Sequence, residues 1–197
     1  MNLLKIICVF SFLFFSSSLF ANKEVYQRIT DFGENISSLK FGFKQAIFSE
    51  DATKYSKGII FYQAREKFKI VYASGIEYIS DSESLWIVDK KKKQALKKSL
   101  NKFFGKEIIQ FFKFGEDLKK YLIDYWQDKE KYYFKFKRDT QDILVFINKK
   151  TLMPNKIIFN KGDLRFEIKI FKIKRNLKLV DEFFLFNPSK NMEVMEF

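Results

Sequence analysis

The chain has 197 residues, a formal net charge of +13 at pH 7, no histidine and one cysteine, Cys8. These absences exclude catalysis by a nucleophile paired with histidine, metal sites built on histidine, and a disulfide within the chain. The positive charge favours anionic partners such as acidic proteins or phospholipid surfaces. A lysine-rich composition of the kind that an AT-rich genome encodes explains the same excess without any partner.

The first 21 residues are predicted to be a secretory signal peptide. Lys5 precedes an apolar run over residues 6–15, and small residues within 16–21 (three serines and Ala21) provide a cleavage site after Ala21. A retained transmembrane anchor would need about 20 apolar residues, and serines interrupt this run. A lipoprotein leader would need its cysteine at the end of the run, whereas Cys8 lies near the start. We therefore expect an exported protein with a single domain over residues 22–197.

Residues 22–39 are predicted to form an amphipathic helix. Apolar residues recur there at the spacing that places them on one helical face, and charged residues lie between them. The apolar positions are Val25, Ile29, Phe32, Ile36 and Leu39.

Beyond this helix the pattern changes to the alternation that is typical of β-strands. We expect about ten or eleven antiparallel strands, connected by short polar turns. The candidate strands are residues 40–47, 58–63, 67–72, 76–80, 84–88, 93–100, 122–127, 131–138, 142–148, 156–160, 164–175, 177–180 and 183–186.

Residues 101–120 interrupt the strands with an apolar stretch that does not alternate, which predicts one or two short helices. The order of elements therefore indicates an α+β fold, in which a large curved antiparallel sheet carries helices on one side.

Phenylalanine is the most unusual feature of the composition, with 26 residues. Each large aromatic side chain buries roughly 150–250 Å², so one small core is not easily filled by all of them. Some could line a concave apolar pocket, covered by the central helices as a lid. A bulky core favoured by codon bias explains the same composition, and both interpretations remain open.

Lysine is densest at Lys90, Lys91, Lys92 and Lys93, close to Trp86. A solvated hairpin end explains this patch, and so does contact with an acidic partner or with lipid headgroups. Nucleic acid would also suit interleaved lysines and aromatics, but an exported chain seldom meets it.

No motif indicates an enzyme, a cofactor or a metal site. The loop carboxylates show no spacing typical of a glycosidase pair, and no glycine-rich phosphate loop occurs. Catalysis by carboxylates alone remains the one enzymatic alternative, with Glu50, Asp51, Asp81, Glu83 and Asp89 as its candidates.

Five segments, in order along nearly the whole domain, resemble the LolA family of periplasmic outer-membrane lipoprotein carriers. They are Ile36–Gln45 (ISSLKFGFKQ), Gly58–Tyr62 with Arg65–Lys69 (GIIFY and REKFK), Ile79–Asp89 (ISDSESLWIVD), Ile147–Pro154 (INKKTLMP) and Phe183–Pro188 (FFLFNP).

The resemblance implies an incomplete antiparallel β-barrel, covered by the N-terminal helix and a central helical lid, which encloses lipoprotein acyl chains. It also implies a monomer that receives lipoproteins from an inner-membrane ABC transporter and delivers them to an outer-membrane acceptor. On this interpretation the acyl-chain wall would be Val25, Ile29, Phe32, Phe61, Phe68, Ile70, Phe134, Phe136, Phe166 and Ile168.

The resemblance further implies a lid that contains Ile108, Phe111 and Phe112, and a polar contact between barrel and lid made by Arg65. The four lysines from Lys90 to Lys93 would meet the transporter or headgroups. The alternative within the same shape is a related periplasmic module that binds another lipid or senses lipoproteins.

Overall fold

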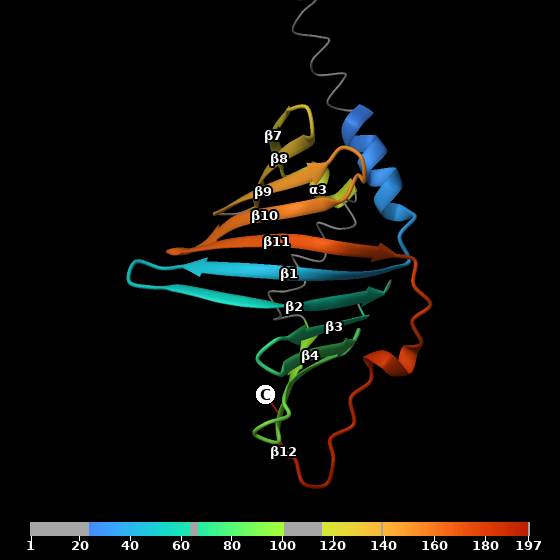
Figure 1. Ribbon diagram of the computed structural model, residues 1–197, viewed down its shortest axis with the longest axis vertical. Coiled ribbons are helices and arrows are strands. Elements are labelled where there is room, and N and C mark those ends of the chain that lie inside the picture. Colours follow the sequence, from blue (N-terminus) through green and yellow to red (C-terminus); the bar gives the residue numbers. More distant parts are fainter. Residues whose placement is uncertain (1–23, 64–66, 101–115, 139, 197) are drawn as a thin grey trace, which may run out of the picture.

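A computed structural model describes residues 24–63, 67–100, 116–138 and 140–196, and it contains one open twelve-stranded sheet (Figure 1). The strand order is β12-β6-β5-β4-β3-β2-β1-β11-β10-β9-β8-β7, so β12 and β7 form two separate edges. Every neighbouring pair is antiparallel except β12 with β6. The curved antiparallel sheet predicted from the sequence is therefore confirmed.

The strands have the following bounds: β1 Ser38–Phe48, β2 Thr53–Gln63, β3 Lys67–Tyr72, β4 Ile76–Asp81, β5 Ser84–Asp89, β6 Gln94–Ser99, β7 Leu122–Gln127, β8 Lys131–Arg138, β9 Gln141–Asn148, β10 Pro154–Lys161, β11 Leu164–Arg175 and β12 Glu193–Glu196. The described helical segments are an N-terminal helix over residues 24–34, α3 (Glu116–Lys119) and the 3-10 helix η2 (Asp181–Phe184).

The N-terminal helix is shorter than the sequence pattern predicts. It ends at residue 34, where the backbone N–H of Ile36 donates to the carbonyl of Gly33 over 3.1 Å. Ser38 and Leu39 already belong to β1, which hydrogen-bonds to β2 on one side and β11 on the other. Pairing on both sides satisfies their backbone groups, so the chain leaves the helix before the apolar spacing ends.

The expected strands near the C-terminus are wrong. Residues 177–180 pair with no strand, and η2 (residues 181–184) takes up the first two residues of the strand expected at 183–186. The last strand is β12 instead, which the sequence pattern did not predict. Apolar residues at 183–186 are as compatible with a segment that packs flat on a sheet as with a strand, and local sequence does not distinguish them.

Alternation gives the sheet two faces, which we name by their relation to the N-terminal helix. The inner face packs against this helix, where Tyr26 contacts the ring of Phe134 with centroids 5.9 Å apart. One large buried cluster joins this helix to side chains from both halves of the sheet. The helix lies beside the ends of β8 to β11 in Figure 1.

The outer face of β3–β6 is covered by the C-terminal strap, which we define as residues 177–192. Phe186 and Met192 of the strap pack against a second buried cluster of Ile79, Val88 and Ala95. Figure 1 shows the strap passing from the end of β11, through η2, to β12 at the far edge. The outer face of β3–β6 is therefore packed beneath the strap.

Candidate functional site

The inner face brings together nine of the ten residues that the sequence assigned to an acyl-chain wall. Seven are buried in the large cluster, and the other two, from the N-terminal helix, pack against it while partly buried. The buried seven are Ile29, Phe68, Ile70, Phe134, Phe136, Phe166 and Ile168; the partly buried two are Val25 and Phe32. The wall thus exists as a continuous apolar surface, and its use for acyl chains remains a prediction.

Phe61 is the exception, because it lies on the outer face. Its ring contacts the ring of Phe183 from the strap, with centroids 4.9 Å apart, and the Nζ of Lys40 lies 5.0 Å from its centroid. Its neighbours Ile60 and Tyr62 belong to the inner cluster instead. The run Ile59–Tyr62 is apolar on both faces, so alternation alone could not decide which residues point inward.

Several inner-face residues were absent from the predicted wall. Phe41 and Phe43 of β1 are buried in the cluster, and the regular alternation of that strand was the signal that could have identified them. Phe159 of β10 stacks on Phe166 with ring centroids 4.6 Å apart and an interplanar angle of 8°. Phe159 follows Ile157 in alternation along a short strand, which is a weaker signal.

The largest rings of the predicted wall are buried in this conformation. Phe134 is fully buried, and Phe68 and Phe136 are each 1% exposed. A cavity of about 690 Å³ lies instead at the β1–β2 hairpin, and none of the ten predicted wall residues lines it. An acyl chain could contact these three rings only if a covering element moved.

Arg65 and the lid residues Ile108, Phe111 and Phe112 lie outside the described residues, as does the proposed signal peptide. The roles predicted for them stay predictions and belong to the proposed function.

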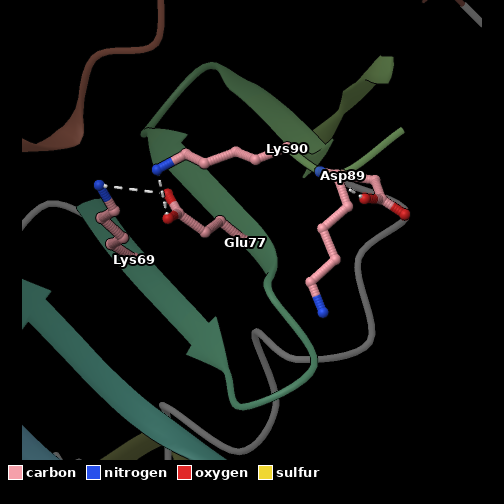
Figure 2. A network of polar contacts seen from close by, with 5 residues as sticks. Lys69, Glu77, Asp89 and Lys90 are labelled. Atoms are coloured by element: carbon pink, nitrogen blue, oxygen red, sulfur yellow. Dashed lines mark hydrogen bonds and ion pairs between the residues drawn. The ribbon is translucent and has the colours of Figure 1, made fainter. Parts of the chain in front are cut away.

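The lysine patch at residues 90–93 forms the turn between β5 and β6. The Oδ1 atom of Asp89 accepts the backbone N–H groups of Lys91 and Lys92 at 3.0 and 3.1 Å, which fixes the turn. The Nζ atom of Lys90 donates to Oε1 of Glu77 over 2.6 Å (Figure 2). All four lysines of the turn are exposed, but the charge of Lys90 is paired within the fold.

Glu77 is the centre of the described polar network. Its Oε2 atom lies 3.4 Å from Nζ of Lys69, so two lysines from different elements converge on one buried carboxylate (Figure 2). Burial by itself would raise the pKa of Glu77, but the hydrogen bond from Lys90 and the charges of both lysines outweigh it and lower this pKa. This arrangement stabilises an ion pair and offers no free acid or base.

Tyr72 lies among the partly buried aromatics on the inner side of β3. Its ring contacts Phe43, with centroids 5.4 Å apart, and burial raises the pKa of its hydroxyl to about 12, with a further contribution from Tyr78. The hydroxyl is therefore neutral at physiological pH and suits an apolar surface.

Among the described residues, acidic side chains nowhere gather in threes that could hold a metal ion. Within the same residues, each helix is too short or too polar to cross a membrane.

No protein-family model and no curated protein sequence matches the chain. Among solved structures, it is similar to an uncharacterised conserved protein from Thermus thermophilus, with a TM-score of 0.56, 11% identity, and coverage of 89% of this chain and 99% of that one. This likeness shows a shared fold.

Two further solved structures are similar at lower TM-scores. One is a LolA superfamily protein from Nitrosomonas europaea, with a TM-score of 0.47, 11% identity, and coverage of 83% of this chain and 96% of that one. The other is a putative outer membrane lipoprotein-sorting protein domain from Vibrio parahaemolyticus, with a TM-score of 0.45, 12% identity, and coverage of 82% and 94%.

Proposed function

We propose that this protein is a periplasmic carrier, which shields lipoprotein acyl chains against the inner face of its sheet and moves lipoproteins from the inner to the outer membrane. The observation that supports this proposal is the inner face itself. An open sheet presents a continuous surface of large apolar side chains, and a short helix over residues 24–34 covers part of it.

The energetics of acyl transfer suit such a surface. Each CH₂ group removed from water contributes roughly 0.8 kcal/mol, so a long acyl chain gains enough to offset the displacement of a covering element. Side chains that already pack together when the protein is empty keep the wall out of water between loads. Non-directional apolar contacts also tolerate chains of different length, as a general carrier requires.

The remaining parts of the proposal extend the resemblance. Residues 101–115 would act as a lid through Ile108, Phe111 and Phe112, and Arg65 would link lid and sheet. The exposed lysines of the β5–β6 turn would contact the inner-membrane ABC transporter. The protein would act as a monomer without cofactor or catalysis, and the signal peptide would direct it to the periplasm.

The test is lipid occupancy of the exported chain, measured by native mass spectrometry after co-expression with a triacylated lipoprotein. We expect a complex of one carrier with one lipoprotein, and no complex with the same lipoprotein lacking its lipidated cysteine. Binding of free lipids without binding of lipoproteins would favour the related lipid-binding or lipoprotein-sensing module instead. Absence of any apolar ligand would exclude both.

A reversible cross-link tests whether the N-terminal helix must move. The guanidinium of Arg175 in β11 lies 4.5 Å from the ring centroid of Phe32, so Phe32→Cys with Arg175→Cys can be bridged by a short reagent that reacts with thiols. We expect loading to fall when the bridge is made and to recover when it is reduced. The matched control is Lys137→Cys with Asp142→Cys, which are partners across β8 and β9 and should load equally in both states.

Depletion in the native cell tests the shuttle itself. Lipoproteins destined for the outer membrane should accumulate at the inner membrane, and their normal departure would contradict the carrier role even if the protein binds acyl chains.

A further inference from the structure

Four adjacent strands in the middle of the sheet carry positive charge almost without compensation. Lysine and arginine contribute two residues to β1, two to β2, two to β10 and five to β11, against a single carboxylate, Glu167. These strands lie side by side in the order β2-β1-β11-β10. These basic residues are scattered along the sequence, and they form one charged surface only when the sheet assembles.

The strand register places four lysines in one row across these strands. Lys57 lies opposite Lys44, Lys44 opposite Lys169, and Lys169 opposite Lys156. Alternation puts the row on the outer face, because Phe43 and Ile170, the residues adjacent to Lys44 and Lys169, are buried in the inner cluster. Like charges directly opposite one another destabilise a sheet, so the row is a cost to the fold.

Glu167, the one carboxylate on these four strands, forms an ion pair with one lysine of the row and leaves the other three without one. Glu167 binds Nζ of Lys156 at 2.9 Å and the guanidinium of Arg165 at 2.8 Å, and these contacts lower its pKa although burial opposes them. Within the described residues, no acidic side chain lies within ion-pair distance of Lys44, Lys57 or Lys169, and all three are exposed.

Large apolar side chains surround this row on the same face. Tyr55 is 79% exposed, Ile59 40% and Phe171 38%. Tyr55 precedes Lys57 by one alternation step along β2, and Ile59 follows it by one. The ring of Phe171 lies directly over Gly42, which has no side chain to lift it away from the sheet.

The cavity of about 690 Å³ opens beside the same residues. Lys44, Lys57 and Lys169 line it together with Ala46, Phe48 and Tyr55. Its size falls in the range of roughly 300–1,000 Å³ that is usual for small-molecule sites. Unpaired ammonium groups therefore border a recess that also offers apolar and aromatic surface.

From this arrangement we propose that the outer face of β10, β11, β1 and β2 docks on an anionic lipid bilayer. Lys44, Lys57 and Lys169 bind the phosphate of a lipid headgroup, and Tyr55, Ile59 and Phe171 enter the interface between headgroups and acyl chains. Lysine and aromatic side chains are the two kinds that favour this interface, and basic residues near an anionic membrane each strengthen binding. The exposed apolar groups favour a bilayer over an acidic protein, whose carboxylates would leave them in water.

This proposal does not depend on lipoprotein transport, because it uses the outer face and transport would use the inner face. A protein that docks in this way holds its inner face directed away from the bilayer.

The experiment is co-sedimentation of the exported chain with vesicles of phosphatidylcholine alone or mixed with phosphatidylglycerol. We expect binding only to the mixed vesicles, and weaker binding at high salt because screening shortens the range of the charges. The variant Lys44→Gln with Lys57→Gln and Lys169→Gln should bind roughly 100-fold more weakly, since each lysine contributes about fivefold at an anionic surface.

A control variant removes the same charge elsewhere. Lys137→Gln with Lys150→Gln and Lys190→Gln changes three exposed lysines outside the row and should bind the mixed vesicles like the unmodified protein. The melting temperature checks the fold: the variant of the row should melt no lower than the parent, because it relieves repulsion between facing lysines.

Three outcomes would overturn the proposal. The first is equal binding by the two triple variants, which would assign attraction to net charge alone. The second is release from vesicles by millimolar glycerol phosphate, which would assign the row to a free phosphate ester. The third is binding to polyglutamate without binding to mixed vesicles, which would assign the face to an acidic protein.

Discussion

The two halves of the outer face differ in whether another segment of the chain covers them. Over β3–β6 the C-terminal strap buries Phe184 and packs Phe186 against Trp86, with ring centroids 5.2 Å apart. Over β10, β11, β1 and most of β2, large side chains such as Tyr55 and Phe171 stay exposed. The same sheet therefore has a second core on one half and an open surface on the other.

The pairing of charged side chains differs between the same two halves. On the covered half, Lys67 binds Asp181 of the strap at 2.8 Å, and Lys69 and Lys90 bind Glu77. On the open half, Lys44 and its neighbours in the row face one another instead. Buried charges must be paired, whereas exposed ones need not be, so unpaired lysines accumulate where nothing in the described fold covers them.

The largest effect is expected from truncating the buried ring of the strap. Phe184 is 1% exposed, so Phe184→Ala should lower the free energy of unfolding by about 3–5 kcal/mol. The matched variant on the open half is Phe171→Ala, which should cost less than about 1.5 kcal/mol because that ring is already partly in water. Urea denaturation measures both, and equal losses would contradict the contrast between the halves.

The next effect compares two glycines. A Cβ at Gly58 would lie 2.4 Å from the backbone oxygen of Val71, which cannot move without disturbing β3, so Gly58→Ala should cost about 1–3 kcal/mol. A Cβ at Gly42 would meet the ring of Phe171 at 2.5 Å. That ring can swing into solvent, so Gly42→Ala should cost less, below about 1 kcal/mol.

Thermal unfolding of the two glycine variants measures how much stability each substitution removes. If Gly42→Ala proved the more damaging, the ring of Phe171 would be held more firmly than an open surface allows.

A smaller effect is expected at the polar network of the covered half. Glu77→Gln removes the charge that pairs with Lys69 and Lys90 and should cost about 1–2 kcal/mol at neutral pH, since Lys90 is largely exposed. The folded-state pKa of Glu77 is lowered, so its contribution is present above its ordinary pKa of 4.5 and is lost as the pH falls through the folded value.

The stability of parent and Glu77→Gln should therefore converge in acid. Urea denaturation at a series of pH values measures this, with Glu83→Gln, an exposed turn carboxylate, as the control that should show no gap. A gap that persists below the folded pKa would assign the loss to packing rather than to charge.

The smallest effect is expected at the β5–β6 turn. Lys91→Gln with Lys92→Gln should change stability by less than about 0.5 kcal/mol, because Asp89 holds the turn through backbone N–H groups that the substitutions leave in place. Differential scanning calorimetry checks this. Asp89→Ala, which removes the acceptor, should lower the melting temperature more than the double lysine variant.

The sequence determined most of the sheet. Alternation predicted β3 and β11 with their observed bounds, because each has one face packed and one face in or near solvent. The bounds of β7 and β8 were also predicted, from the polar turns that follow them. Most of the inner wall followed from the same alternation. Phe61 did not, because its strand is apolar on both faces and only the register with β1 decides the direction of each side chain.

The tertiary structure alone decided three features: the early end of the N-terminal helix, the strap over β3–β6, and the row of lysines. Each depends on segments far apart in the chain, such as Lys57 with Lys44 and Lys44 with Lys169. The sequence pointed to Lys90–Lys93 as the basic surface because those lysines are adjacent along the chain. Folding fixes Lys90 on Glu77 and aligns scattered lysines across four strands, since strand register, and not sequence distance, sets which charges become neighbours.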